Sequence, residues 1–297
     1  MMAAHNQQLQ GRAASAFAID AKRAREVRVL VLTGYGLNCE AETAAGFSMV
    51  GADVTCTHAA EVFSGGADAL AGYHVLAFIG GFSFGDHIAS GRVYANRLRY
   101  RLGDRLARFI DDGGLAIGIC NGFQTMVKLG LLPALGRAPG SGLAEQTASL
   151  LHNDRLGYRD AWVRLLIDPD SPCVWTRGLA AHGLLAVPSR HGEGKLVFSD
   201  EALAREVAES RLIPVRYADE EGRPTERWPD NPNGSPGGAA GLCDASGRLF
   251  GLMPHPEAYL YPEAHPDWLR QRDADALPEF GAGLGVLANG VRAVIDG

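Results

Sequence analysis

The sequence predicts an α/β protein with a central, mostly parallel sheet, helices on both faces and additional mixed strands in the C-terminal half. Between residues 27 and 130, short apolar runs alternate with segments of helical periodicity, an order that is typical of parallel strands joined by helices. The apolar runs are continuous rather than alternating with polar residues, as expected for strands buried on both faces.

The first half of the chain predicts four strands, at residues 27–33, 52–57, 75–79 and 115–119. Helices are expected at residues 40–50, 97–111 and 121–130. The clearest helical pattern lies in 97–111, where apolar residues recur every three or four positions with arginines between them. One face of this helix can therefore pack on the sheet.

After Pro133 the rhythm changes, and the predicted strands are short and of mixed or antiparallel type. They are 161–167, 184–187, 195–198, 213–217 and 249–253, with one helix near 200–208. Residues 222–238 contain four prolines and four glycines and are expected to form a long loop. Because no linker is visible, we expect residues 27–297 to form a single domain.

Residues 1–26 are expected to form a mobile N-terminal extension. The stretch is rich in Ala, Gln and Arg, and Asp20 is its only acidic residue before Glu26. It lacks the apolar core of a secretory signal, and a transit peptide is the alternative interpretation.

Composition excludes several classes of protein. The formal net charge is −6, which disfavours non-specific binding to nucleic acid. The sequence contains no run of 18 consecutive apolar residues, so no membrane-spanning helix is expected. The five cysteines are odd in number and form no C-x-x-C pair, so no disulfide framework can include them all. This cysteine usage fits a reducing compartment, and we expect a cytoplasmic protein.

Cys120 is the best candidate for a nucleophile. It lies in Gly118-Ile119-Cys120-Asn121-Gly122, directly after an apolar strand and before a helix. This G-x-C-x-G is the thiol version of the nucleophile elbow, a sharp turn that exposes the nucleophile at the carboxyl end of a sheet. The flanking glycines remove Cβ atoms that would clash with the neighbouring strand and helix.

The other cysteines are weaker candidates. Cys39 also follows a strand and precedes a helix, but it lacks the second glycine and is expected to pack in the loop beside the site. The remaining three, Cys56, Cys173 and Cys243, are expected in the core.

A thiol nucleophile needs a base and a group that orients the base. His255 is the best placed histidine, in Met253-Pro254-His255-Pro256-Glu257 after the strand 249–253. Two prolines predict an extended segment, in which His255 and Glu257 point to the same face. Glu257 can then accept a hydrogen bond from one imidazole nitrogen while the other faces the thiol.

Attack on an amide also requires N–H donors for the developing oxyanion. The N–H of Asn121 and the glycine-rich loop 80–86 are the two candidate sources. A phosphate-binding loop is the alternative for 80–86, but neither G-x-G-x-x-G nor G-K-[ST] is present. No metal is expected, because H-E-x-x-H and paired cysteines are absent. His191 and Glu193 could in principle offer ligands, but the sequence around them does not favour a metal site.

Taken together, these residues resemble the class I, triad-type glutamine amidotransferases, and in particular the glutaminase subunits of phosphoribosylformylglycinamidine synthases. Eight motifs occur in the order typical of that family. They are GLNCE at 36–40, GGFSFGD at 80–86, GICNGFQ at 118–124, GLLP at 130–133, HND at 152–154, HGEGK at 191–195, NPNGS at 231–235 and MPHPE at 253–257.

The resemblance implies a flavodoxin-like fold and a specific set of site residues. The implied triad is Cys120, His255 and Glu257, and the implied oxyanion hole is built around Gly81 and Asn121. Two side chains are implied to bind glutamine: Gln124 and Phe82. Three more lie in loops that contact either substrate or partner, or are simply solvated: His191, Glu193 and Asn233. At position 258 the family usually has Arg, whereas this chain has Ala.

The resemblance also implies a substrate and a partner. L-glutamine is hydrolysed here, and ammonia passes to a large synthetase subunit, in some cases with a small accessory subunit. ATP and magnesium are expected on the synthetase, and no cofactor is expected on this chain. Two alternatives remain open at this stage: a cysteine hydrolase of the same fold acting on another amide or a peptide, and a non-catalytic regulatory subunit.

Overall fold

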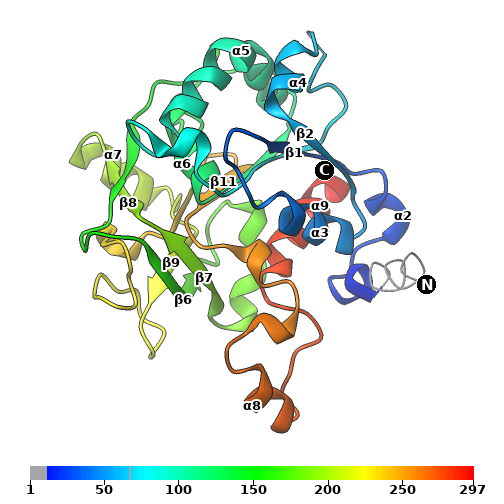
Figure 1. The fold of residues 1–297 in the computed structure, drawn as a ribbon, viewed down its shortest axis with the longest axis vertical. Helices are drawn as coiled ribbons and strands as arrows, with labels where there is room; N and C mark the ends of the chain where they lie inside the picture. Colours follow the sequence, from blue (N-terminus) through cyan, green and yellow to red (C-terminus); the bar gives the residue numbers. More distant parts are fainter. Residues whose placement is uncertain (1–11, 67) are drawn as a thin grey trace.

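The computed structural model describes residues 12–66 and 68–297, and its centre is a six-stranded sheet (Figure 1). The strand order is β10-β11-β4-β3-β1-β2. The strands are β1 (Arg28–Thr33), β2 (Asp53–His58), β3 (Val75–Phe78), β4 (Leu115–Ile119), β10 (Gly241–Cys243) and β11 (Leu249–Leu252). All neighbours are parallel except β10, which pairs antiparallel with β11 at one edge. The predicted mostly parallel sheet is confirmed.

Helices lie on both sides of this sheet (Figure 1). On one side α5 (Arg92–Asp111) packs against α6 (Asn121–Lys128), and on the other α3 (Glu40–Met49) packs against α9 (Leu284–Asp296). The predicted apolar stripe of α5 is buried, and the helix begins five residues earlier than predicted. A short helix, α4 (Ala59–Ser64), follows β2.

Two small antiparallel sheets make up much of the second half. In one, β5 (Ala148–His152) pairs with β8 (Glu193–Phe198). In the other, β6 (Arg159–Ile167) lies between β7 (Leu185–His191) and β9 (Val215–Ala218). The helix α7 (Glu201–Glu209) follows β8. The strands predicted at 161–167, 184–187, 195–198 and 213–217 are thus present in separate antiparallel sheets. The strand predicted at 249–253 differs, because it forms β11, which pairs parallel with β4 in the central sheet.

The described part of the N-terminal segment packs on the body of the protein, unlike the mobile extension that we expected. Residues 1–11 of that segment lie outside the described residues. Ala13, Ala14 and Ile19 are buried, and α2 (Ala21–Ala24) contacts α9. The guanidinium of Arg292 donates a hydrogen bond to the Phe17 carbonyl. Small apolar side chains therefore anchor a segment whose composition suggested an extension.

Short elements complete the chain. The 3-10 turns are η1 (Ser83–Asp86), η2 (Val174–Thr176), η3 (Leu179–His182), η4 (Pro236–Gly238), η5 (Pro256–Ala258) and η6 (Pro262–Ala264). The helix α8 (Trp268–Asp273) lies in an excursion that projects from the body in Figure 1. Across the described ranges, no helix has the length and apolar character needed to cross a membrane.

Candidate active site

Cys120 occupies the sharp turn between β4 and α6. All five residues of β4 are buried, and the chain reverses at Cys120 with φ 52° and ψ −107°. A positive φ is uncommon for any residue other than glycine and is often found at functional sites. The elbow predicted from G-x-C-x-G is therefore the geometry observed.

The glycines on either side of Cys120 allow this turn. A Cβ atom at Gly122 would lie 1.8 Å from the Phe78 carbonyl oxygen, and one at Gly118 would lie 2.5 Å from the Met126 sulfur. Contacts this short are sterically excluded, so the start of α6 can approach β3 and β4 only because both positions lack a side chain.

Strand pairing brings Cys120 beside His255. The end of β4 aligns with the end of β11, with Ile119 opposite Leu252. The Cys120 N–H donates a 2.8 Å hydrogen bond to the Leu252 carbonyl. Three residues after β11, the His255 N–H donates to the Pro188 carbonyl at 2.7 Å, which fixes the backbone of the histidine. Cys120 and His255 border the same cavity of about 330 Å³.

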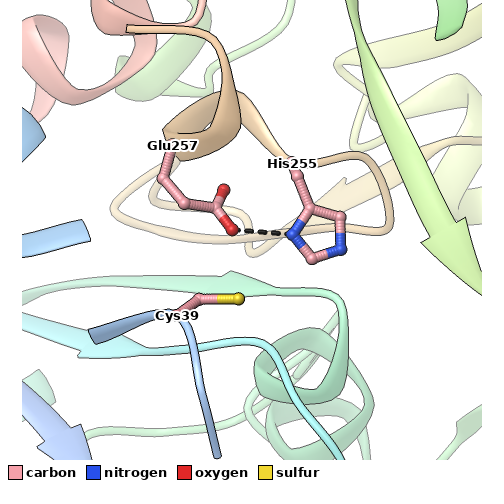
Figure 2. Close-up of side chains that lie close together, drawn as sticks. All are labelled: Cys39, His255 and Glu257. Carbon is pink, nitrogen blue, oxygen red and sulfur yellow. Dashed lines mark hydrogen bonds and ion pairs between the residues drawn. The ribbon is translucent and has the colours of Figure 1, made fainter. Parts of the chain in front are cut away.

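His255 and Glu257 form a buried pair. Figure 2 shows the imidazole Nδ1 facing the carboxylate, and the distance from Nδ1 to Oε1 is 2.7 Å. The segment is not extended as we predicted, because Pro256–Ala258 forms the 3-10 turn η5. Proline is compatible with the first position of a helical turn, where its missing N–H has no partner to lose. The turn places the carboxylate of Glu257 beside the ring.

The surroundings of His255 favour its protonated form. Burial by itself lowers the pKa of the imidazole, but the Glu257 carboxylate and the thiols of Cys120 and Cys39 outweigh burial and raise this pKa well above its ordinary value. The imidazole Nε2 has no hydrogen-bond partner among the described residues. That nitrogen is therefore available to exchange a proton with the thiol.

Cys39 lies on the other side of the pair, at the start of α3. Its sulfur is directed toward the space beside His255 and Glu257 (Figure 2). The ligand atoms of these three residues lie within 4.8 Å of one another, a potential metal-binding group that sequence analysis did not predict. Burial raises the pKa of the Cys39 thiol, and the imidazole of His255 partly opposes the shift.

Two backbone donors face the same region. The loop that contains Gly81 is held by Phe82 N–H, which donates to the Gly36 carbonyl at 2.9 Å. Gly81 has φ 129°, and a Cβ there would lie 2.7 Å from the Leu37 Cα, so only glycine fits. Within 12–66 and 68–297, neither the Gly81 N–H nor the Asn121 N–H donates a hydrogen bond to the protein. Both are available for an oxyanion.

A second cavity, of about 230 Å³, adjoins the first and shares Gly81, Phe82 and Cys120 with it. Phe82, Gln124 and Glu193 line it, together with Cys120 and Gly81. The Gln124 amide donates to the Glu193 carbonyl oxygen at 2.6 Å, and its oxygen accepts from the Asn121 side chain at 3.0 Å. Gln124 and Phe82, which the resemblance implies bind glutamine, thus line the same cavity as Cys120.

His191 and Asn233 lie deeper than an interface loop would. The His191 ring bonds the Asn153 side chain at 3.1 Å, and burial, assisted by His255, lowers its pKa to about 3. Asn233 is fully buried and donates to the Tyr217 hydroxyl at 3.0 Å. The sequence left the loop of Asn233 as a candidate for substrate contact, partner contact or a solvated loop, and the Asn233 side chain itself is hydrogen-bonded inside the fold.

Several lining residues were missed. Asp86 accepts a hydrogen bond from the Asn121 side chain at 2.9 Å, and His152, Tyr158 and Arg190 also border the 230 Å³ cavity. The motifs at 80–86 and 152–154 contain the first two, which was the available signal. Tyr158 lies in no motif, and only the fold brings it to the site.

The remaining cysteines also differ in part from expectation. Cys173 and Cys243 are buried as predicted, but Cys56 is exposed, because β2 is an edge strand. A larger cavity, of about 710 Å³, has Gly114, His74 and Arg248 in its wall and so lies at the opposite ends of the strands from Cys120.

Comparison with known proteins shows what the chain is similar to. Residues 26–292 match the family described as the CobB/CobQ-like glutamine amidotransferase domain. A Methanococcus maripaludis protein named phosphoribosylformylglycinamidine synthase subunit PurQ is 40% identical over 259 residues, which cover 85% of this chain and 92% of that protein. A protein of the same name from Dehalococcoides mccartyi is 38% identical over 267 residues, with coverages of 90% and 97%.

The fold also matches a solved structure. A chain in the structure of PurLQS from Thermotoga maritima superposes with a TM-score of 0.64 at 24% identity, covering 91% of this chain and 99% of that chain. At this identity the likeness shows a shared fold.

Proposed function

Because this chain belongs to the CobB/CobQ-like glutamine amidotransferase family, we propose that it is the glutaminase subunit of a phosphoribosylformylglycinamidine synthase. The observation that carries this proposal is the pairing of an elbow cysteine with a buried His255–Glu257 pair in the segment that follows the adjacent strand. Thiol, imidazole and carboxylate are the groups required for nucleophilic attack on an amide.

In the proposed reaction, Cys120 attacks the side-chain amide of L-glutamine. His255 takes the thiol proton and delivers it to the leaving nitrogen, which departs as ammonia. Glu257 orients the imidazole and stabilises its charged form through the 2.7 Å hydrogen bond. A glutamyl thioester then remains on Cys120, and water activated by His255 releases glutamate.

The oxyanion is stabilised by the N–H groups of Gly81 and Asn121, which have no acceptor in the part of the chain that the structure describes. We place glutamine in the 230 Å³ cavity, between Gln124 and Phe82. Glu193 lines the same cavity, and its carboxylate accepts a hydrogen bond from the Ser90 N–H at 3.1 Å. We infer that this carboxylate binds the α-ammonium group of the substrate.

The ammonia requires an acceptor, and we propose that a large synthetase subunit supplies it, with ATP and magnesium bound there. On this proposal the synthetase converts formylglycinamide ribonucleotide to formylglycinamidine ribonucleotide. All five cysteines lie in the described part of the chain and are free thiols, which supports a reducing, cytoplasmic location.

The decisive experiment measures glutamate formed from glutamine by the complex with the synthetase. Cys120→Ala should abolish it, whereas Cys56→Ser, which alters an exposed thiol, should leave it unchanged. Full glutaminase activity in Cys120→Ala would overturn the assignment. Activity on peptides without any synthetase would favour a general cysteine hydrolase instead.

A further inference from the structure

Cys39 is a second thiol at the catalytic pair, and the proposed reaction does not use it. Its sulfur, an imidazole nitrogen of His255 and a carboxylate oxygen of Glu257 all lie within 4.8 Å of one another (Figure 2). His255 and Glu257 are more than nine-tenths buried, at 5% and 2% exposure, and Cys39 is half-buried. The three groups come from two distant segments that the fold brings together.

These three groups form a donor set that zinc prefers. Thiolate sulfur, imidazole nitrogen and carboxylate oxygen are the usual protein ligands of Zn²⁺, at about 2.0–2.3 Å from the ion. Ligand atoms around one tetrahedral ion are then roughly 3–4 Å apart. Separations of up to 4.8 Å must shorten slightly to reach that range, and the 2.7 Å separation of the His255 Nδ1 and the Glu257 Oε1 must lengthen slightly.

Two further observations point to a ligand. The Glu257 Oε2 is buried and has no hydrogen-bond partner among the described residues. A cavity of about 330 Å³, bordered by Cys39, His255, Glu257 and Cys120, gives an ion access and leaves room for a water molecule as fourth ligand. Buried polar atoms without partners are uncommon in folded proteins.

We propose that Cys39, His255 and Glu257 form an inhibitory site for zinc or a similar thiophilic divalent cation. The Cys39 thiol releases its proton to solvent as the sulfur–metal bond forms. The His255 Nδ1 loses its proton to solvent and exchanges its hydrogen bond with Glu257 for a bond to the metal. The ring then keeps its remaining proton on Nε2 and can no longer accept the Cys120 proton. The inhibition rests on the proposed function, whereas binding of the metal does not.

The test has a binding arm that is independent of activity. Zn²⁺ affinity is measured by calorimetry, and Co²⁺ is used as a probe, because thiolate ligation gives a charge-transfer absorption band. Loss of an outer-shell partner typically weakens metal binding about 10–100-fold, so loss of the ligand sulfur in Cys39→Ser should cost at least as much. The matched control Cys56→Ser should bind Zn²⁺ and Co²⁺ like the unaltered chain.

A third variant separates this site from the nucleophile. Cys120→Ser should keep the Zn²⁺ affinity and the Co²⁺ band, whereas a site built on Cys120 would lose both. In the activity arm, Zn²⁺ should inhibit glutamate formation by the complex. The Zn²⁺ concentration that halves the metal-free rate should be at least about tenfold higher for Cys39→Ser than for the unaltered chain, each measured against its own metal-free rate.

Three results would overturn the proposal. They are the absence of stoichiometric Zn²⁺ binding, equal affinity in Cys39→Ser, and loss of binding in Cys120→Ser. If the chain proves to lack glutaminase activity altogether, the proposed function fails, and the binding arm still decides the metal site.

Discussion

Gly122 packs so closely against the carbonyl oxygen of Phe78 that a Cβ atom at position 122 would lie 1.8 Å from that oxygen. The contact joins the first turn of α6 to the end of β3. Because the atom that would clash belongs to the backbone, no change of rotamer can relieve it. The position of Cys120 immediately before α6 therefore depends on a glycine at position 122.

Gly122→Ala should lower the free energy of unfolding by about 3 kcal/mol or more, the upper end of what overpacking costs. Urea denaturation measures the change. The matched control is Gly103→Ala within α5, where the nearest atom would be the Leu143 Cδ1 at 3.8 Å. The control should raise stability by about 0.5–1 kcal/mol, since alanine is the better helix former. Equal effects of the two changes would contradict this account of the elbow.

Glu257→Gln should lower the pKa of His255, because burial then acts without the opposing carboxylate. In the unaltered chain the raised pKa adds stability below the ordinary value of 6.5, and this stability is lost as pH rises through the folded value. NMR titration of the imidazole checks the shift.

The same change, Glu257→Gln, should also lower glutaminase activity by roughly 10³-fold or more. Glu42→Gln, an exposed carboxylate beside the 330 Å³ cavity, is the control and should leave the titration unchanged.

His191→Gln should make stability less sensitive to acid. The His191 ring is buried and its pKa is lowered to about 3. Below pH 6.5 the imidazole is therefore protonated in the unfolded chain but stays neutral in the folded chain. The contribution of His191 to the free energy of unfolding is therefore at its maximum above pH 6.5, and it decreases by about 2 kcal/mol between pH 6.5 and pH 5. Denaturation at pH 7.5 and pH 5 measures the slope. An unchanged slope in the variant would show that the ring is protonated inside the fold.

Removal of residues 1–26 should lower the melting temperature, because Ala13, Ala14 and Ile19 are buried against the body of the protein. Ile19→Ala alone should lower the free energy of unfolding by about 1–2 kcal/mol. This is at or below the low end of the range for truncated core side chains, because Ile19 lies at the margin of the core. Thermal unfolding of both variants checks this. A melting temperature that does not change on truncation would restore the interpretation of this segment as a mobile extension.

Local patterns predicted the parts of the site that depend on neighbouring residues. The run of buried residues in β4, the elbow at Cys120 and the start of α6 follow from residues 115–122 alone. The 3-10 turn at Pro256–Ala258 was missed, since proline excludes helix interiors but is accepted at the first position.

Features that depend on distant contacts could not be predicted. Cys39 lies close to His255 only because the segments that follow β1 and β11 converge at the carboxyl ends of the parallel strands. Phe17 meets Arg292 across the whole length of the sequence. The strands β5 and β10 are short and carry no pattern of their own, and pairing with β8 and β11 forms them.

The parts of the site differ in how they are held. Cys120 and His255 follow neighbouring strands joined by the ladder of β4 and β11, so their separation cannot change without breaking the central sheet. The Gly81 N–H belongs to a loop that is held to a second loop, residues 34–38, and not to a strand ladder. Three backbone hydrogen bonds join the two loops: Phe82 N–H to the Gly36 carbonyl, Phe84 N–H to the Tyr35 carbonyl and Asn38 N–H to the Gly80 carbonyl. A partner that adjusts the rate of the enzyme is therefore expected to act on the oxyanion donor. The thiol and its base stay permanently assembled, and only the stabilisation of the transition state is adjustable.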